Sequence, residues 1–392
     1  MERLSDRLYS WASVLEPNTL QQAEALSRLP IIAGHVALMP DAHLGIGSTV
    51  GSVIPTRGAI IPAAIGVDIG CGMIAARTDL RATDLPDGLE PFVDAMQTVV
   101  PAGLGKWHAE PKPEAYPWWE QHRGSVRTQL TDRQVKTLLI QLGTMGSGNH
   151  FFEVALDQHQ AVWILMHSGS RGIGNQLANL HMDVAKRECE FDFLALRGRK
   201  EDGSLAWLEE GTAEFEAHIA DMNFAQAYAL KNRSMMMDAA VGWLAGWLGR
   251  GREVQRVNCH HNFTAREVHD GVEVWVTRKG AIRAGAGDLG LIPGSMGGRS
   301  YVVRGKANPL SYESCAHGAG RRLSRRAART TLTIESLRER MAGRAWQAGS
   351  AEALLDEHPE AYKDIDVVMA DQADLVDVLY ELRGIANYKG TS

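Results

Sequence analysis

The stretch GVDIGCG, residues 66–72, places a carboxylate, Asp68, and a thiol, Cys71, three positions apart. Its three glycines predict a sharp turn whose backbone lies close to another part of the chain. An aspartate and a cysteine that project from one turn are typical of a metal centre, because both bind a cation as anions. The alternative is a tight turn in which Cys71 is buried and Asp68 caps backbone groups. The stretch alone supports both interpretations.

Short apolar and β-branched runs, separated by glycine and proline, surround this turn and predict buried strands over residues 35–78. Further strands are predicted at 136–142, 151–156, 161–167 and 272–277. Helical spacing of apolar residues predicts helices at 18–28, 85–100, 208–248, 333–343 and 370–384. The Pro- and Trp-rich stretch 101–125 predicts a surface loop. Because strands and helices do not alternate regularly, we predict an α+β fold.

No Ser/Gly-rich linker and no internal repeat divides the 392 residues. We therefore expect one domain over residues 1–392, with a helical insertion or hairpin at about 208–248. The chain has no apolar run long enough to span a membrane, and MERLSDRLYSW at its start does not resemble a signal peptide. Four cysteines are too few for a disulfide scaffold of this length, so we expect a cytoplasmic protein with reduced thiols.

The net charge of −6 argues against a protein that binds nucleic acid by bulk charge attraction. A polyanion site would have to be a local basic patch. The run GRRLSRRAARTT is one candidate, and its arginines are Arg321, Arg322, Arg325, Arg326 and Arg329. A solvated basic face of a helix explains the same run.

Three histidines stand at the ends of strand-like runs, in GTMGSGNHFFEV, WILMHSGSRGIG and VNCHHNF: His150, His167 and His261. A strand end is a rigid position from which a side chain can enter a cleft. Each histidine alone is explained by a hydrogen-bonded place in the core. Together with Asp68 and Cys71, however, they supply carboxylate, thiolate and imidazole ligands. Their dispersal favours a catalytic centre over a structural zinc site with paired ligands, and a bridging thiolate would allow two metal ions.

A fourth histidine, His317 in SCAHGAGRRLSR, precedes a glycine-rich turn and the basic run. Upstream lie RKGAIRAGAG (278–287) and LIPGSMGGRS (291–300), whose backbone N–H groups and cations suit phosphate oxygens. Neither segment matches the Walker pattern or the dinucleotide fingerprint. A phosphate site and ordinary loop glycines are both consistent with this spacing.

The assembled motifs resemble those of the RtcB family of RNA-splicing ligases over nearly the full length. The resemblance rests on MPDAHLGIGSTVGSVIPTRGAIIPAAIGVDIGCG, GTMGSGNHF, HSGSRGIGN, NCHHN, VTRKGA, IPGSMGGRSYVVRG, SCAHGAGR, AYKDIDVVM and the closing YKG, in family order. It implies a single RtcB-like domain with mixed β-sheets around a buried metal centre and peripheral helices. It also implies an enzyme that uses GTP and two Mn²⁺ ions to join an RNA 3′-phosphate or 2′,3′-cyclic phosphate to a 5′-hydroxyl, in tRNA splicing or RNA repair.

The resemblance further implies roles for single residues. His317 falls at the position of the nucleophile that takes GMP. The implied metal ligands, with Cys71 shared between two ions, are Asp68, Cys71, His150, His167 and His261. The positions implied to hold the guanylate or its phosphate are Asn149, Phe151, Glu153, Asn262, Lys279, Ser295, Ser300, His317, Gly318, Tyr362 and Lys389. His260 is not expected to be a ligand, and an archease-type activator is an implied partner.

One position departs from the family pattern: Ile46, in DAHLGIGS, is apolar where relatives often carry a basic residue. A paralogue specialised for another nucleic-acid end is therefore an alternative. A metal-dependent phosphohydrolase is another, because it would use similar ligands without needing His317 or Lys389. An RNA-binding accessory protein without activity is the third.

Overall fold

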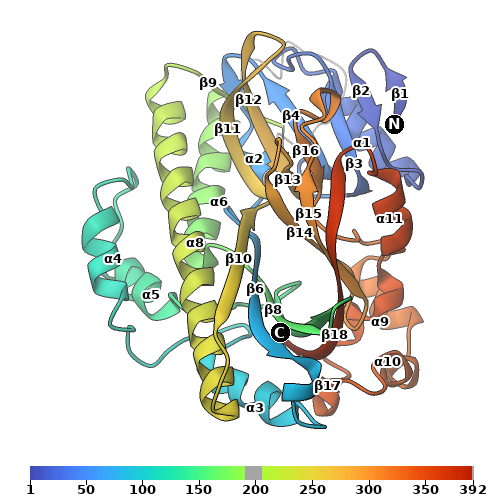
Figure 1. The fold of residues 1–392 in the computed structure, drawn as a ribbon. Helices are drawn as coiled ribbons and strands as arrows, with labels where there is room; N and C mark the ends of the chain where they lie inside the picture. Colours follow the sequence, from blue (N-terminus) through green and yellow to red (C-terminus); the bar gives the residue numbers. More distant parts are fainter. Residues whose placement is uncertain (190–204, 391–392) are drawn as a thin grey trace.

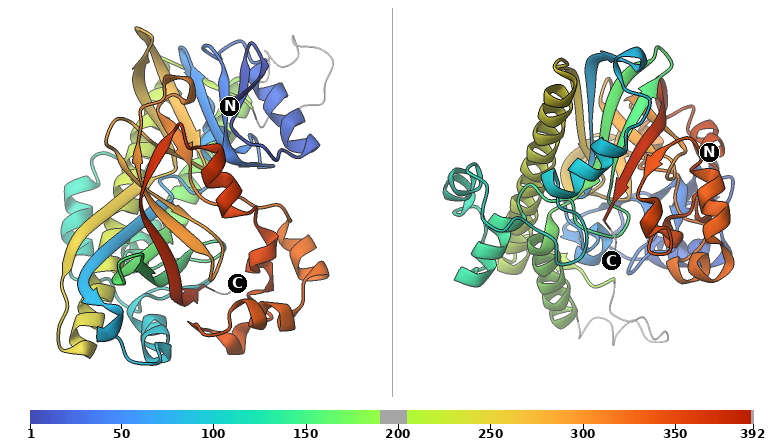
Figure 2. Two further views of the ribbon diagram at one scale, coloured as in Figure 1. Left: turned by 45° about the vertical axis from the view of Figure 1, so that its right-hand side comes forward. Right: turned by 90° about the horizontal axis from the view of Figure 1, so that it is seen from below.

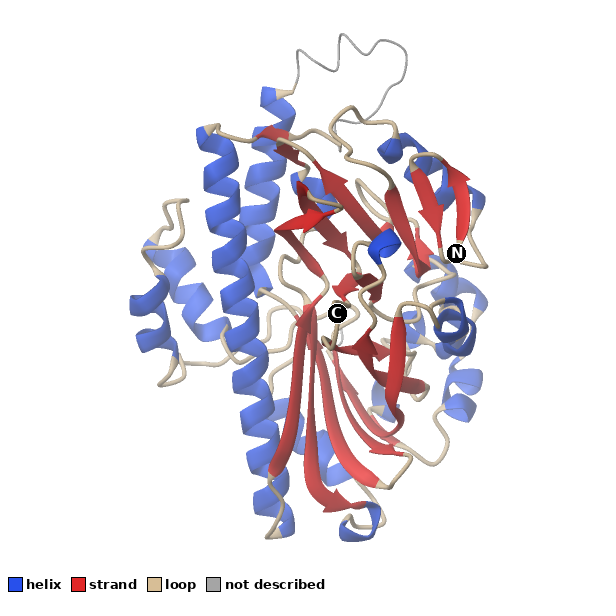
Figure 3. Cartoon of the chain, turned by 45° about the horizontal axis from the view of Figure 1, so that its top comes forward, coloured by secondary structure: helices blue, strands red, loops and turns tan. Residues whose placement is uncertain are grey.

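Two mixed β-sheets form the framework of the chain, and helices flank it, with the longest ones on the left in Figure 1 and α9 (Arg325–Thr331), α10 (Ile334–Arg340) and α11 (Ile365–Asp371) on the right. The computed structural model describes residues 1–189 and 205–390. The six-stranded sheet has the order β1 (Glu2–Ser5), β2 (Leu8–Ser10), β3 (Val36–His43), β4 (Val50–Thr56), β12 (Val272–Lys279) and β11 (Asn262–His269). In Figure 3 the two sheets lie one above the other, with the longest helix beside both. The predicted α+β class is confirmed.

The second sheet has eight strands, and buried clusters pack on both of its faces. Its order is β10 (Glu253–His260), β6 (Gly72–Arg81), β8 (Ala161–Ser168), β7 (Phe151–Asp157), β18 (Val376–Lys389), β15 (Arg299–Gly305) and β14 (Leu289–Pro293), with β17 (Ala345–Trp346) parallel to β18. All of β8 is buried, because Ile164 and Met166 pack toward the helices while Trp163 and Leu165 pack toward β14 and β15. Burial on both faces explains the unbroken apolar run of this strand. Two small pairs complete the strands: β13 (Ala281–Arg283) with β16 (Ser314–Ala316), and β5 (Ala59–Ile60) with β9 (Leu208–Glu209).

The helix α8 (Ala213–Leu248) runs along the side of both sheets and contacts α6 (Arg171–Glu188), with α4 (Ala115–His122) and α5 (Asp132–Gln141) beyond them (Figures 1 and 2). Thr212 caps its start, and Gly249 ends it in the left-handed region. The predicted helix over 208–248 is thus confirmed, as one continuous helix rather than a hairpin. Among residues 1–189 and 205–390, no helix is long and apolar enough to cross a membrane.

The remaining helices are short and lie around the sheets. They are α1 (Pro17–Ser27), α2 (Pro62–Ile65), α3 (Glu90–Val99), α9 (Arg325–Thr331), α10 (Ile334–Arg340) and α11 (Ile365–Asp371). The part of the chain that the structure describes also contains five single turns of 3₁₀ helix: η1 (Ala82–Asp84), η2 (Pro309–Ser311), η3 (Ala348–Ser350), η4 (Leu355–Glu357) and η5 (Pro359–Ala361). The helices predicted near 18–28, 85–100 and 333–343 are confirmed as α1, α3 and α10.

Two predicted elements are wrong. The run at 136–142 is helix α5 and not a strand, because Thr131 and Gln134 form a capping box and Leu138, Leu139 and Leu142 face one core. The run at 370–384 is mostly strand β18 and not a helix, because it pairs with β15 on one side and β7 on the other. The stretch 101–125, predicted as a loop, also contains α4.

The two sheets are joined at His261, which lies between the last residue of β10 and the first of β11. Its backbone N–H donates to the carbonyl of Cys71 at 2.8 Å, so the turn at 66–72 lies against this crossing point. Gly70 has a φ of +70°, and a Cβ there would lie 2.9 Å from the Cα of Gln226 in α8. A glycine is therefore needed at position 70 for both backbone conformation and space.

A buried arginine on α8, Arg233, fastens the turn to the sheet. Its Nη1 donates to the carbonyls of Gly70 and Ser168 at 2.8 and 3.0 Å, and its Nε donates to Asn258 at 2.8 Å. The side chain is fully buried, so no water replaces these bonds.

Replacing this arginine should destabilise the whole chain. We expect Arg233→Met to lower the free energy of unfolding by about 3 kcal/mol, because buried carbonyls lose their donor. Urea denaturation followed by circular dichroism measures the change. The exposed Arg57→Ala variant is the control, and equal stability of the two variants would contradict this role of Arg233.

Candidate metal centre and nucleotide cavity

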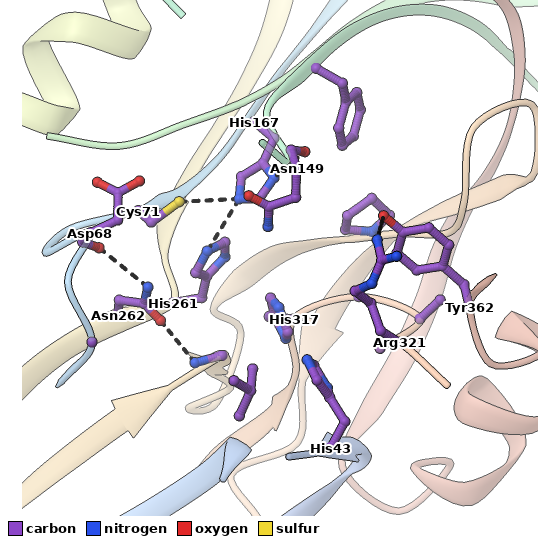
Figure 4. Close-up of a pocket in the computed structure, with 18 of the residues that line it drawn as sticks. His43, Asp68, Cys71, Asn149, His167, His261, Asn262, His317, Arg321 and Tyr362 are labelled. Carbon is purple, nitrogen blue, oxygen red and sulfur yellow. Dashed lines mark hydrogen bonds between the residues drawn. The ribbon is translucent and has the colours of Figure 1, made fainter. Parts of the chain in front are cut away.

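Five side chains converge from four segments of the chain. Figure 4 shows four of them: Asp68, Cys71, His167 and His261. Cys71 Sγ lies 3.4 Å from His150 Nε2 and 3.2 Å from His167 Nε2. His167 Nε2 lies 3.3 Å from His261 Nε2, and His150 Nε2 lies 3.0 Å from Asp68 Oδ2. The ligand atoms form two trios, each within 4.8 Å: Cys71, His167 and His261, and Asp68, Cys71 and His150. The thiol of Cys71 belongs to both.

Hydrogen bonds on the far side of two rings fix which nitrogen faces the thiol. His150 Nδ1 donates to the carbonyl of Met145 at 2.9 Å, and His167 Nδ1 donates to that of Asn149 at 3.2 Å. Because a carbonyl oxygen only accepts, both protons lie on Nδ1 and both Nε2 lone pairs point at Cys71. Lone pairs that meet in a buried place repel one another unless a cation lies between them. The residues therefore fit one or two divalent metal ions.

Burial keeps three of the candidate ligands, Cys71, His167 and His261, in uncharged forms. Burial lowers the pKa of His167 and of His261 well below the ordinary value, and neighbouring imidazoles lower it further. Burial raises the pKa of the Cys71 thiol well above its ordinary value, and the Asp68 charge adds to this. The rings of His167 and His261 are thus uncharged at neutral pH, each with one nitrogen lone pair, whereas the Cys71 thiol releases its proton when a cation binds.

The carboxylate of Asp68 is held by backbone and side-chain donors. Ser170 N and Ser170 Oγ donate to Asp68 Oδ1 at 3.0 and 3.3 Å. Burial raises the pKa of Asp68, but the contacts with His150 outweigh burial and keep the pKa below its ordinary value. Asp68 is therefore ionised at neutral pH.

His317 lies beside this cluster, with its ring 4.8 Å from that of His261 between centroids. Its Nδ1 donates to Asp41 Oδ2 at 2.6 Å, and the same oxygen accepts from the backbone N–H groups of His317 and Gly318 at 3.2 Å. Asp41 is fully buried on β3. The carboxylate holds the Nδ1 proton, so Nε2 carries a free lone pair, as a nucleophile requires.

A cavity of about 340 Å³ opens beside His317. This volume lies within the range of pockets that hold small molecules, ~300–1,000 Å³. All eleven residues predicted to bind the guanylate or its phosphate line it: Asn149, Phe151, Glu153, Asn262, Lys279, Ser295, Ser300, His317, Gly318, Tyr362 and Lys389. Four of the five candidate ligands, Asp68, Cys71, His167 and His261, also line it, and His150 reaches the cluster through Cys71 and Asp68.

Strand register explains why residues that are far apart in sequence line the same wall of the cavity. Lys389 on β18 lies opposite Phe151 on β7, and Phe151 lies opposite His167 on β8. Two positions along β7, Glu153 faces the same side and lies opposite Asn387. Side chains two apart in a strand share a face, so one row of the sheet carries a cation, an aromatic ring and a ligand.

Near the metal cluster, Lys279 is buried at the end of β12. Its Nζ donates to the carbonyls of Ile46 and, at 3.2 Å, Ala63, and burial lowers its pKa to about 7. Asn262 accepts from the N–H of Gly280 at 2.9 Å and donates to the carbonyl of Asp68 at 3.2 Å. Gly280 has a φ of +62°, and a Cβ there would lie 3.0 Å from the His317 ring. The turn at Gly280 therefore brings Lys279 close to the imidazole of His317.

Sequence reasoning missed two residues of the site, Asp41 and Glu357. Asp41, in the quoted MPDAHLG motif, received no role, although a carboxylate two residues before a histidine could have indicated an imidazole partner. For His43, in the same motif, two roles were left open, support of a metal ligand and a place near the RNA end; the residue lines the cavity, with burial lowering its pKa to about 4. Glu357 belongs to no motif and could not be found. The basic run is only partly solvated, since Arg321 and Arg325 line the cavity.

The thiol shared by both trios should dominate metal affinity. We expect Cys71→Ala to weaken Mn²⁺ binding by about 100-fold or to remove it, because both trios lose a ligand. Isothermal titration with Mn²⁺ measures affinity and stoichiometry. Cys315→Ala, which removes a buried thiol outside both trios, is the control. Unchanged affinity and stoichiometry in Cys71→Ala would exclude a bridging thiolate.

A second prediction concerns Glu153, whose pKa burial raises to about 7 despite the hydrogen bond from Asn387. A raised carboxyl pKa means that ionising the group disfavours the folded state, so stability is lost as pH rises through 7. We expect Glu153→Gln to raise the free energy of unfolding by about 2 kcal/mol at pH 8 and to leave it unchanged at pH 4. Urea denaturation at both pH values measures this, with the exposed Glu110→Gln as control. A gain of equal size at both pH values would refute it.

Comparison with known proteins shows which family the chain belongs to. Residues 22–390 match the family model described as tRNA-splicing ligase RtcB. The RNA-splicing ligase RtcB of Escherichia coli K12 is 44% identical over 393 aligned residues, which cover 96% of this chain and 95% of the relative. The tRNA-splicing ligase RtcB of Nanoarchaeum equitans is 30% identical, covering 98% and 94%, and the RNA-splicing ligase RtcB of Mycobacterium tuberculosis is 29% identical, covering 89% and 94%. The chain therefore belongs to the RtcB family.

Proposed function

We propose that this protein is an RNA ligase that joins an RNA 3′-phosphate or 2′,3′-cyclic phosphate end to a 5′-hydroxyl end through a guanylylated His317. The reaction would use GTP and two Mn²⁺ ions. Membership of the RtcB family supports the assignment as an RNA ligase. The observation that carries the finer proposal is the His317 imidazole, held by Asp41 on one nitrogen and lying between the metal-binding cluster and a nucleotide-sized cavity.

The proposed first step uses the free lone pair of His317. Nε2 attacks the α-phosphorus of GTP, a P–N bond forms, and the bond to the bridging oxygen breaks, so pyrophosphate leaves. Asp41 keeps the Nδ1 proton and stabilises the positive charge that the ring acquires. Lys279 lies in the same cavity as a cation for phosphate oxygens.

A 2′,3′-cyclic phosphate end would first be opened by water, which forms a new P–O bond while the bond to the 2′-oxygen breaks and leaves a 2′-hydroxyl. In the second step, an oxygen of the RNA 3′-phosphate attacks the phosphorus on His317. The P–N bond breaks, the imidazole is restored, and an RNA end activated as a diphosphate with guanosine forms. In the third step, the 5′-hydroxyl oxygen attacks the RNA 3′-phosphorus, GMP leaves, and the hydroxyl proton goes to solvent. Mn²⁺ held by Asp68, Cys71, His150, His167 and His261 would offset phosphate charge and acidify the attacking hydroxyl.

The test is covalent labelling. We expect the chain incubated with GTP and Mn²⁺ to gain the mass of one GMP, and His317→Ala to gain none because the attacking nitrogen is absent. Intact-protein mass spectrometry measures both, and the exposed His159→Ala is the control. A GMP adduct on His317→Ala would remove this residue from its proposed role.

A ligation assay with RNA ends separates the alternatives. Joining of a 2′,3′-cyclic phosphate RNA to a 5′-hydroxyl RNA, dependent on GTP and Mn²⁺, supports the full proposal. Phosphate release without an adduct would support a phosphohydrolase, and RNA binding without either would support an accessory protein. An adduct with joining only of DNA ends would support a specialised paralogue, for which the exposed Ile46 at the cavity is a candidate determinant. An archease-type activator stays a prediction, tested by adding one to this assay.

A further inference from the structure

Strand β3 contains a bulge near its end. Leu38 is paired with Ser52 of β4, and the next pair is His43 with Val50, so residues 39–42 lie opposite a single residue of β4. On the other side, β2 pairs with β3 only as far as Leu38. Within residues 1–189 and 205–390, neither neighbouring strand therefore pairs with residues 39–42, which we call the β3 bulge. A bulge re-aims the side chains that it carries.

Side chains take the place of the missing strand partners. Lys363 Nζ donates to the carbonyl of Ala42 at 2.6 Å and, over a longer 3.5 Å, to that of Pro40. His43 Nδ1 donates to the carbonyl between them, that of Asp41, at 2.9 Å. The three carbonyls belong to buried residues. Because buried carbonyls need donors, the conformation of the bulge depends on these two side chains.

The same lysine is also joined to the segment that carries His317. The backbone N–H of Lys363 donates to the carbonyl of Gly320 at 2.9 Å. Gly320 in turn packs so closely on the carbonyl of Asp41 that a Cβ would not fit between them. Lys363 therefore holds the β3 bulge through its side chain and the His317 segment through its backbone.

The ammonium group of Lys363 is committed to carbonyls. Its third acceptor is the carbonyl of Val14 at 2.8 Å. A tether for the N-terminal segment would explain the contact with Val14, but it would not explain the contacts on both sides of Asp41. Hydrogen bonds from a charged donor are stronger than those from a neutral one, so this side chain is suited to hold an irregular stretch of backbone.

We propose that Lys363 is a positioning residue for His317, because it fixes the β3 bulge so that the carboxylate of Asp41 holds the Nδ1 proton of the ring. Asp41 Oδ2 accepts from His317 Nδ1 and from the backbone N–H groups of His317 and Gly318, so a shift of the bulge would weaken all three bonds. The inference rests on the proposed function only in that His317 is the nucleophile. A nucleophile held less precisely reacts more slowly, although the substrate binds as before.

The first experiment separates the rate of GMP transfer from the binding of GTP. Intact-protein mass spectrometry follows a single turnover of the full chain with Mn²⁺ over a series of GTP concentrations. We expect Lys363→Met to lower the rate constant at saturating GTP by about 10-fold and to change the half-saturating GTP concentration by less than about 2-fold. The second value also reports whether the neighbouring Tyr362, which lines the cavity, stays in place. A first-order rate constant does not depend on how much of the variant is folded.

Two control variants remove comparable contacts elsewhere. Lys306→Met removes another lysine that donates to a backbone carbonyl, at 2.8 Å. Ser13→Ala loosens the N-terminal segment by removing the hydroxyl that donates to Asp371 at 2.7 Å. Both should stay within about 2-fold of the wild-type rate. Lys363→Gln keeps N–H donors on a shorter side chain and should lose about 3-fold, which tests the inference by itself if Lys363→Met does not fold.

The second experiment observes the bond between Asp41 and His317 and needs no GTP. The full chain with isotope-labelled histidines is studied by NMR without Mn²⁺, whose unpaired electrons would broaden the signals. The Nδ1 proton of His317 is assigned by its absence from His317→Gln. We expect this proton to exchange with water about 10-fold faster in Lys363→Met and at the wild-type rate in Lys306→Met, because a less fixed carboxylate releases it more often.

An unchanged rate constant in Lys363→Met would overturn the inference. A lower rate constant with unchanged exchange of the His317 proton would also overturn it, because the lysine would then act elsewhere. So would a higher half-saturating GTP concentration without a change in rate constant. The proposed function fails separately: a wild-type chain that forms no adduct, while Lys363→Met still speeds this exchange, would mean that the lysine positions a ring that is not the nucleophile.

Discussion

The site depends on one electrostatic constraint: several electron-pair donors are buried around the thiol of Cys71. Hydrogen bonds from His150 and His167 to backbone carbonyls turn their unprotonated nitrogens inward, toward that sulfur. Such a cluster is unfavourable without a cation, so the surrounding structure has to hold it. Arg233 does so, because it binds the carbonyls of Gly70 and Ser168, each next to a ligand residue. The same Arg233 contacts therefore stabilise the core and hold the candidate metal ligands in position.

The two sheets supply different parts of the chemistry. The eight-stranded sheet carries His167 on β8 and the row of Phe151 and Lys389. In the proposed reaction this side of the cavity would hold the metal ions and the base. The six-stranded sheet carries Asp41 and Lys279, on the side that would hold the nucleophile and the phosphate. His261 stands where the chain passes from one sheet to the other. A relative movement of the sheets would separate His317 from the metal ligands, so rigidity between them is a functional requirement.

Sequence motifs predicted the residues of the candidate site better than the spacing of apolar residues predicted the helices and strands. The ligands and cavity residues lie in motifs whose order in sequence is distinctive, and the structure brings them together. Arg233 lies within the helix predicted at 208–248, and only its long-range bonds reveal its importance. The strand β18 was mistaken for a helix because pairing with β7 and β15 overrides the helical spacing of its apolar residues. The helix α5 was mistaken for a strand because the capping box at Thr131 went unrecognised.

The net charge of the chain conceals how its cations are distributed. Of the basic run, Arg325 and Arg329 are paired with Asp356, and Arg325 also with Glu357, so much of their charge is already neutralised. Lys389 is also paired with Glu357, whereas Lys279 has carbonyl partners and no ion pair within residues 1–189 and 205–390. Burial lowers the pKa of Lys279 to about 7, so a phosphate entering the cavity would meet a partly protonated lysine and favour its charged form, whereas the arginines are cations already held by acids. Lys279 would neutralise phosphate charge, and the arginines would orient the ligand. In this way an acidic chain can form a local site for a polyanion.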